Sequence, residues 1–285
     1  MEPSGGAFFV DFIFGFQKSF SSKSRLILYG GVDMNSKYKQ LIAKEFRNCV
    51  LKTIDRVNRN EQTYRPFHTA LLSEDVIFWS GFERSFSTSF GQRVIEEIAR
   101  LVALSNGAEA AERQHETFAV VNVAYENAIQ AHMQRLRSGE RSLYDWNSTL
   151  DAVFSGPRAK ASIRHRIISD LWWKKDGINH YVSLKTVKPN IDQTAVAKED
   201  CLRLTAADQK CKAYFGLPYN PYGERKEDYN HNPPMGIFDF RHDSIVLIGK
   251  DLWDTLGGPG CYEDLLSIAR DVGRETKAII ERMRG

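Results

Sequence analysis

An aspartate and a lysine stand at positions from which they could act on one phosphate. Residues 167–187 form two β-rich runs separated by Asp176-Gly177, a two-residue hairpin signal. Cross-strand partners then have numbers that sum to 353, so Asp170 faces Ser183, and Lys185 lies two residues along on the same face. The diagonal pair Asp170 and Lys185 is roughly 6–8 Å apart. A carboxylate that holds Mg²⁺ against a phosphate, with a lysine that positions or deprotonates water, suits phosphodiester hydrolysis.

The alternative is an ordinary cross-strand ion pair on a solvated sheet face, which contributes less than about 1 kcal/mol. One observation favours a site over this alternative. Asp170 lies between Ile168 and Trp172 on its predicted face, and an aspartate with apolar neighbours is costly to bury unless something coordinates it.

Three segments of the sequence resemble one family of nucleases. The hairpin with the residues after it, SDLWW…YVSLKTVKPNIDQT, resembles the PD-(D/E)xK nuclease motif, and in particular that of type II restriction endonucleases of the TdeIII/MjaII group. Residues 82–92 (FERSFSTSFGQ) and residues 215–223 (FGLPYNPYG) with 248–258 (IGKDLWDTLGG) are similar to the same group. The resemblance covers most of the chain from residue 64 onward. It implies that Asp170 is a metal ligand, that Lys185 is the motif lysine and that the cofactor is Mg²⁺.

Ser183 departs from the family pattern, which has Asp or Glu at this position. By the resemblance, Glu199 on the following helix is one candidate to supply the missing carboxylate, and Glu83 on an earlier helix is another that would orient a metal-bound water. The alternatives stay open, since Glu199 also fits a solvated helix position. Glu83 likewise fits an ion pair with Arg84 or a hydrogen bond to Ser87.

Two groups of polar residues are candidates for DNA contacts. The first would bind the phosphate backbone beside the hairpin, and the second belongs to a Tyr- and Asn-rich loop that would read base edges. A solvated basic face and a loop packed by its own tyrosines are the alternatives. The candidates are Arg158, Arg164, Arg166, Lys188, Asn190 and Gln193 for the first group, and Asn220, Tyr222 and Arg225 for the second.

Hydrophobic spacing predicts the elements that must position these residues. Helices are expected at 36–59, at 74–104 with a break near Gly91, at 108–137 and at 142–154. After the hairpin come a helix from 193 to 211 capped by Asp192, strands at 213–217 and 245–249, and a last helix at 262–283. The expected fold is α/β (α+β), a restriction-endonuclease-like mixed sheet flanked by helices. Residues 1–73 form a helical region with dimerisation as a candidate role, and residues 74–285 form the nuclease core with its recognition loops.

Composition narrows the classes of protein to which the sequence can belong. The 285 residues include 39 Lys and Arg against 36 Asp and Glu, a net charge of +3 that permits nucleic-acid binding without requiring it. Four cysteines without a C-x-x-C pair exclude the usual zinc spacings and a disulfide framework, which favours the cytoplasm. The apolar stretch 7–16 is interrupted by Asp11 and is too short for a membrane span.

Together these features predict a type II site-specific endodeoxyribonuclease that cuts double-stranded DNA with Mg²⁺ and leaves 5′-phosphate ends. A palindromic target calls for a two-fold homodimer, and a restriction system calls for a matching DNA methyltransferase. The resembled group is associated with GGNCC-like targets. Two other functions remain open at this point: a non-catalytic DNA-binding protein on a decayed nuclease fold, and a repair nuclease that reads DNA structure.

Overall fold

A five-stranded mixed sheet is the centre of the fold. The computed structural model describes residues 34–59, 64–140, 145–231 and 236–284; the apolar stretch 7–16 lies outside them. The strands follow the order β1-β2-β3-β4-β5, with antiparallel pairing from β1 to β3 and parallel pairing from β3 to β5. They are β1 (Ala110–Asn122), β2 (Ser162–Lys175), β3 (Ile178–Leu184), β4 (Lys212–Leu217) and β5 (Val246–Ile248). The predicted mixed sheet flanked by helices is confirmed.

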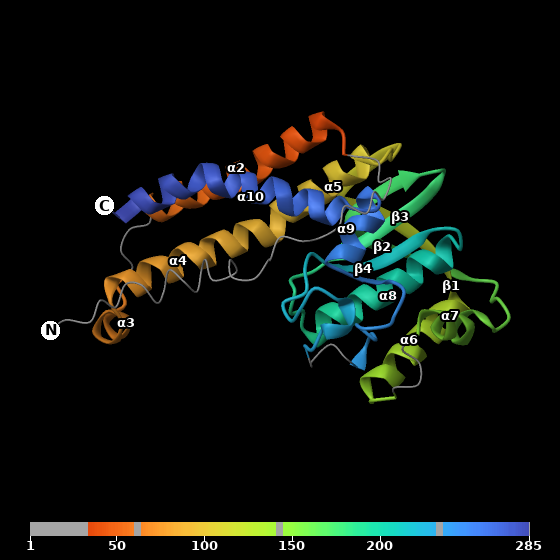
Figure 1. The fold of residues 1–285 in the computed structure, drawn as a ribbon. Coiled ribbons are helices and arrows are strands. Elements are labelled where there is room, and N and C mark those ends of the chain that lie inside the picture. Colours follow the sequence, from red (N-terminus) through yellow and green to blue (C-terminus); the bar gives the residue numbers. More distant parts are fainter. Residues whose placement is uncertain (1–33, 60–63, 141–144, 232–235, 285) are drawn as a thin grey trace. The chain divides into compact units, whose positions relative to one another are not determined.

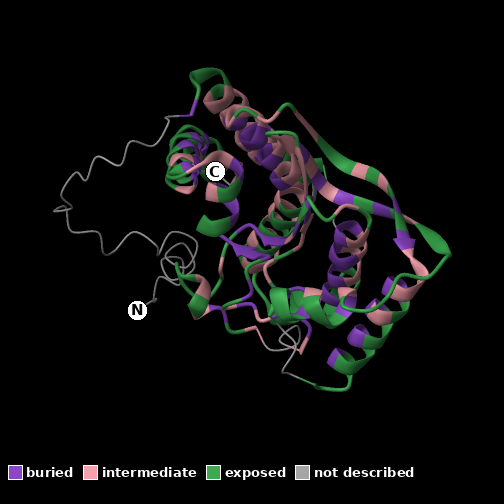
Figure 2. Cartoon of the chain, turned by 90° about the vertical axis from the view of Figure 1, so that its right-hand side faces the viewer, coloured by how far each residue is buried: buried purple, intermediate pink, exposed green. Residues whose placement is uncertain are grey.

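Helices cover both faces of this sheet (Figure 1). One face is covered by α6 (Val123–Arg137), α7 (Trp146–Phe154) and α8 (Ile191–Ala207), and the other by α5 (Ile95–Ser105) and α9 (Lys250–Gly257). Each face has its own apolar core: Phe215 and Leu202 lie in the first, and Leu171 and Val102 lie in the second. Figure 2 shows the buried residues gathered along the strands and on the helix sides that face them.

A layer of long helices adjoins the second core. The helix α2 (Ser36–Arg59) packs against α10 (Cys261–Glu281) and α4 (Glu74–Ser89). The short helix α3 (Pro66–Leu71) precedes α4. Among the described residues, no helix is both long and apolar enough to cross a membrane. The predicted bounds of α2 agree with the structure, and α2 packs in the same compact unit as the sheet.

The helix expected at 74–104 is distorted near Gly91 and not broken there. The segment η2 (Phe90–Val94) is π-helical and joins α4 to α5. A π-helical turn accommodates an extra residue, so the faces of the two helices are offset from one another.

The predicted helix at 108–137 is wrong in its first half. Residues 110–122 form β1, and the helix α6 begins only at Val123. The segment AAERQ contains good helix formers, but β1 pairs with β2 from Ala110–Lys174 to Asn122–Ser162. This pairing overrides local propensity, because strand stability depends on cross-strand contacts that the segment alone does not reveal.

The start of α8 also differs from the prediction. Asn190, and not Asp192, is the N-cap, and it forms a capping box with Gln193. The helix ends at Ala207, four residues before the predicted end, and β3 ends at Leu184. Helix α9 and the short 3₁₀ turns η3 (Lys226–Asp228) and η5 (Arg282–Arg284) were not predicted.

Candidate active site

The β2–β3 hairpin has the register that its turn predicts. Lys175 pairs with Ile178 and Leu171 with Val182, so partner numbers sum to 353. Asp176 and Gly177 have φ angles of 51° and 72°. Two successive positive φ values are typical of the type I′ turn, whose twist matches that of the flanking strands. The hairpin register is therefore confirmed.

Asp170 lies in direct contact with the motif lysine. The Nζ of Lys185 donates to Asp170 Oδ2 at 2.9 Å, and the Oγ of Ser183 lies 3.4 Å from the same oxygen. The side chains of Lys185 and Asp170 are 25% and 19% exposed. The pair is thus held together at a partly buried position that solvent and a ligand can still reach.

The backbone of β4 fixes the position of Lys185. The amide of Lys185 donates to the carbonyl of Gly216 at 3.0 Å, one residue after β3 ends. A Cβ on Gly216 would lie 2.9 Å from Cγ2 of Val182 and 3.0 Å from Cδ2 of Leu184, so the glycine leaves room for these two side chains of β3. The lysine therefore starts from a rigid main-chain position.

The structure adds two residues on the opposite side of Asp170. The Nε2 of Gln114, on β1, donates to Asp170 Oδ1 at 3.2 Å and to Glu96 Oε1 at 3.0 Å. Glu96 lies in the first turn of α5. Burial raises the pKa of Glu96 above its usual value; the bond from Gln114 opposes this rise, and the charge of Asp170 adds to it. Two carboxylates thus lie on either side of one amide nitrogen.

Neither Glu96 nor Gln114 is among the site residues that the sequence predicts. The helix expected over residues 108–137 does not place Gln114 opposite Asp170. The run of β-branched and aromatic residues from Thr117 to Val121 was the available signal for a strand. Glu96 has no local signal, since its approach to Asp170 depends on how α5 crosses the sheet.

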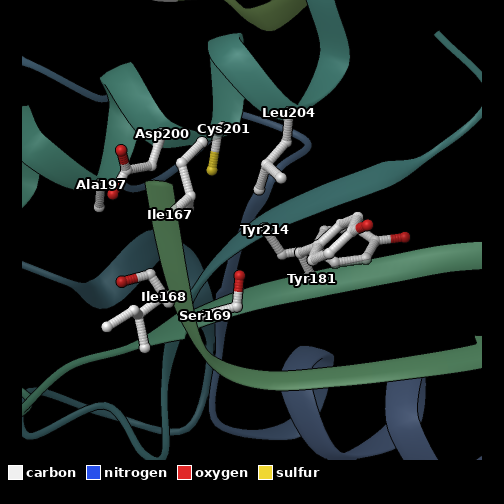
Figure 3. A pocket seen from close by; sticks show the side chains of 10 residues that line it. Ile167, Ile168, Ser169, Tyr181, Ala197, Asp200, Cys201, Leu204 and Tyr214 are labelled. Carbon is white, nitrogen blue, oxygen red and sulfur yellow. The ribbon is translucent and has the colours of Figure 1, made fainter. Parts of the chain in front are cut away.

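A third carboxylate, Asp200, faces the hairpin from α8. It lines a small pocket together with Ser169 and Ser183, and Figure 3 shows Asp200 on the helix above Ser169 of β2. Burial raises the pKa of Asp200 to about 6, although the charges of Arg203 and Lys185 oppose the rise.

Glu199 and its neighbour Asp200 share one basic partner. Both pair with Arg203, Glu199 at 3.5 Å and Asp200 at 3.8 Å, and Glu199 pairs in addition with Arg137 at 3.7 Å. On a helix with about 100° per residue, Glu199 lies about 160° from the buried Ala197, whereas Asp200 lies about 60° from it. The structure does not bring Glu199 to Asp170, and its role as a ligand stays a prediction. The positions of the buried residues around α8 distinguish the two acids, because they show which side of the helix faces the sheet.

Glu83 is exposed on α4 and accepts a hydrogen bond from Ser87 Oγ at 2.6 Å. Among the contacts of the described residues, none joins Glu83 to Asp170, Lys185 or Ser183. Its catalytic role also stays a prediction.

The carboxylates at this site fit a hard divalent cation that takes few of its ligands from the protein. No cluster of three or more His, Cys, Asp or Glu residues arranged to hold a metal occurs in the described part of the chain. Mg²⁺ commonly binds through one or two carboxylates and completes its shell with water and substrate phosphate oxygens. Asp170 and Glu96 supply two such carboxylates.

The predicted phosphate-contacting arginines are exposed, and each has a neighbour in the protein. The guanidinium of Arg164 stacks over Phe118 at 3.9 Å from the ring centroid. Arg166 forms an ion pair with Glu116, and the Nε of Arg158 donates to the hydroxyl of Tyr125. These side chains have fixed positions on and beside β2.

The predicted recognition loop is ordered by its own side chains. Asn220 donates to the carbonyl of Arg225 at 2.6 Å, and Arg225 forms an ion pair with Asp228 at 2.8 Å. The fully buried Tyr229 donates its hydroxyl to the carbonyl of Val187 at 3.0 Å. The loop is thereby attached to the segment that follows Lys185.

Three further candidates lie where that segment and the loop meet. Lys188 stands over the ring of Tyr222, 5.5 Å from its centroid. Asn190 and Gln193 bond to one another in the capping box of α8. This capping role occupies the side-chain oxygens of both residues, and a contact of either with DNA stays a prediction.

Comparison with known proteins finds one family over most of the chain. Residues 34–273 match the family described as type II restriction endonuclease, HinfI. Two type II restriction enzymes of Herpetosiphon aurantiacus, HgiEI and HgiBI, are each 29% identical over 222 residues, which cover 76% of this chain and 80% of the relative. A third, HgiCII from the same organism, is 27% identical over 219 residues, 73% of this chain and 77% of its own.

A five-stranded mixed sheet with helices on both faces is consistent with a restriction-endonuclease-like nuclease fold. The chain belongs to the HinfI family of type II restriction endonucleases, and its substrate is DNA. The type II class that the motifs implied is confirmed, and HinfI is the family that the comparison identifies.

Proposed function

We propose that this enzyme hydrolyses both strands of DNA at a short palindromic site with Mg²⁺ and leaves 5′-phosphate and 3′-hydroxyl ends. The observation that supports this most directly is the contact of Lys185 Nζ with Asp170 Oδ2 at 2.9 Å, with the carboxylate of Glu96 on the other side of Asp170. A lysine beside two acids is the donor set that metal-assisted hydrolysis needs.

In this proposal Asp170 and Glu96 hold the cation. When bound, the cation neutralises phosphate charge and makes a bound water more acidic. Lys185 donates a hydrogen bond to the attacking water and orients its lone pair toward phosphorus. The water oxygen forms the new P–O bond and loses a proton to solvent. The bond from phosphorus to the 3′ oxygen breaks, and that oxygen takes up a proton.

Asp200 and Ser183 have supporting roles in the same proposal. Asp200 lines the same pocket as Ser183, and the charge of Lys185 opposes the rise in the pKa of its carboxyl group. Its carboxylate helps to keep that lysine positioned between β3 and α8. Glu199 and Glu83, the acids expected from the family pattern, remain candidates for the metal, to be tested against Glu96.

DNA contacts divide between two surfaces. Arg158, Arg164 and Arg166 bind phosphates, because they are exposed and basic beside the strand that carries Asp170. Asn220, Tyr222 and Arg225 read bases, because Tyr229 anchors their loop to the chain just after Lys185. Lys188, Asn190 and Gln193 lie between the two surfaces and contact the backbone near the cut.

A palindromic target requires two active sites, so we propose a homodimer. The surface we assign to it surrounds α3, where Tyr64, Phe67, Leu71 and Leu72 are 89%, 81%, 80% and 45% exposed. Together they present on the order of 500 Å² of apolar surface. That is at the upper end for a monomer and a large part of the ~800 Å² that each partner contributes to a specific interface. The neighbouring α4 packs against α2, and its aromatic residues are only partly exposed, so the surface we assign is that of α3 and the residues beside it.

Light scattering on size-exclusion fractions tests the dimer surface. The double variant Phe67→Ser, Leu71→Ser is expected to be monomeric, while the control Leu266→Ser, which changes an exposed leucine on α10, stays dimeric. A parent protein that is already monomeric contradicts the dimer, and a dimeric double variant places the interface elsewhere.

The cellular setting follows from the class. A nuclease of this kind requires a methyltransferase that protects the same sequence in the host DNA, and it works in the cytoplasm, where DNA is accessible. The four cysteines are all buried free thiols, which fits a reducing compartment.

Digestion of a sequenced plasmid tests the function directly. With Mg²⁺, discrete fragments whose ends can be ligated are expected, and EDTA should abolish them. No cutting with any divalent cation would support a non-catalytic DNA-binding protein. Cutting only at junctions or ends would support a repair nuclease.

A further inference from the structure

Gln114 has an unusual backbone for a residue inside a strand. Its φ is +49°, in the left-handed region that non-glycine residues rarely adopt. On either side of it the register is regular, with Arg113 opposite Leu171 and His115 opposite Ser169. Gln114 therefore stands opposite Asp170, at the one position between these pairs where the ladder is interrupted. Strained backbone that a fold maintains at a functional site commonly has a role there.

The side chain of Gln114 occupies the space between two acids. Its amide nitrogen carries two hydrogens and donates to Glu96 Oε1 at 3.0 Å and to Asp170 Oδ1 at 3.2 Å. The other oxygen of Asp170 accepts from Lys185. Without this donor, the two partly buried carboxylates would repel one another.

We infer that Gln114 is a placeholder for the divalent cation: its amide nitrogen occupies the position between Asp170 and Glu96 and leaves when the cation binds there. This inference rests on the proposed function. An amide nitrogen donates hydrogen bonds and has no lone pair for a metal, so the amide and the cation compete for the same two carboxylates. In the free enzyme the amide holds the two carboxylates together, and its presence weakens the binding of the cation.

If the amide of Gln114 competes with the cation, removing that amide should strengthen metal binding. Replacing Gln114 by glycine removes the competitor and also suits the positive φ. The Gln114→Gly variant should bind Mn²⁺, measured by calorimetry without DNA, several-fold more tightly than the parent. Gln114→Lys should bind Mn²⁺ at least tenfold more weakly, because its ammonium group would stay between the acids. Val120→Gly, at an exposed position of the same strand, controls for a weakened strand and should bind Mn²⁺ like the parent.

Each result has one meaning. If Gln114→Gly binds Mn²⁺ equally or less tightly than the parent, Gln114 supports the site and is no placeholder. If Asp170→Asn binds Mn²⁺ as the parent does, the metal site of the proposed function is itself misplaced. A folded state that matches the parent by circular dichroism is required of each variant, and Gln114→Asn, which keeps an amide and tolerates positive φ, should fall between the parent and Gln114→Gly.

Discussion

Asp170 has two unlike sides. On the β3 side it meets a cation and a hydroxyl, Lys185 and Ser183, which belong to the same hairpin. On the β1 side it meets an amide, Gln114, and through it a second acid, Glu96, from a helix on the other face of the sheet. The first side satisfies the charge of Asp170, and the second adds negative charge near it.

The difference indicates a division of labour. The β3 side is rigid, because the turn fixes its register and the carbonyl of Gly216 fixes Lys185. It suits a group that must hold a water in one orientation. The β1 side gathers negative charge around a donor that can leave, which suits a site for a cation. The following variants test this division, from the largest expected effect to the smallest.

Removing either member of the central pair should abolish catalysis. Asp170→Ala and Lys185→Ala are each expected to lower the cleavage rate by at least about 10³-fold, or roughly 4 kcal/mol of transition-state free energy. Gel-shift assays in Ca²⁺ or EDTA should still detect specific DNA binding. The control is Lys174→Ala, an exposed lysine of the same hairpin that pairs with Glu109. Cleavage by either site variant above about a tenth of the parent rate would misplace the site.

The β1 side of Asp170 is tested by changing two neighbouring acids, Glu96 and Glu97. Glu96→Gln should reduce cleavage about 100-fold, since it removes one of the two anionic ligands that we propose for the cation. Glu97→Gln changes the next residue, which pairs with Arg100 and Arg113, and should stay within about threefold of the parent. Glu83→Gln belongs in the same single-turnover series. A larger loss for Glu83→Gln than for Glu96→Gln would restore Glu83 as the ligand.

Changes in the recognition loop should weaken DNA binding without altering the contacts of Asp170. Arg225→Ala is expected to weaken binding to the cognate site by about 1–3 kcal/mol and to change binding to random DNA much less. Arg164→Ala and Arg166→Ala should weaken binding to all sequences and reduce the salt dependence. Fluorescence anisotropy at several salt concentrations measures both. Equal losses for Arg225→Ala on the two kinds of DNA would move base recognition to another part of the chain.

The two acids on α8 should separate activity from stability. Asp200→Ala is expected to slow cleavage about tenfold, because it faces Ser183 and the field of Lys185. Glu199→Ala should cut within about threefold of the parent but unfold more easily, since Arg137 and Arg203 lose a partner. If instead Glu199→Ala is nearly inactive, α8 supplies Glu199 to the metal as the family pattern suggests.

Asp200 also predicts a pH dependence. Burial raises its pKa from 3.8 to about 6, so the folded state favours the protonated acid. The stability associated with that proton is present below about pH 4 and lost as the pH rises through 6. Asp200→Asn should therefore unfold like the parent at pH 4 and be more stable by about 2 kcal/mol at pH 8. Urea titrations at both pH values measure this, with the exposed Asp192→Asn as control. No gain at pH 8 would contradict the burial of a charged Asp200.

The part of the site that depends on local sequence was predictable. Asp176-Gly177 specifies a turn, the turn specifies the register, and the register brings Asp170 to Lys185 within the contacts of one hairpin. Asn190 could have been chosen over Asp192 by the same kind of reasoning, because Gln193 stands three residues after it as in a capping box.

The rest of the site depends on contacts distant in sequence. Gln114 and Asp170 are 56 residues apart, and their approach requires β1 to be a strand although its first residues favour a helix. Glu96 reaches Gln114 only because α5 crosses the second face of the sheet at that point. No window of sequence contains that information.

The π-helical turn at Phe90–Val94 sets the rotation of α4 relative to α5. Such a turn is one residue longer than the α-helical path between the same ends. Deleting a single residue from it would join α4 and α5 into one regular helix and rotate one relative to the other by about 100°. Because Ile95, Ile98 and Val102 hold α5 in the second core, the rotation would fall on α4, which has no buried residue. A one-codon deletion some twenty residues before Gln114 would thus leave Glu96 beside Gln114 and turn the α4 face that packs against α2 away from it.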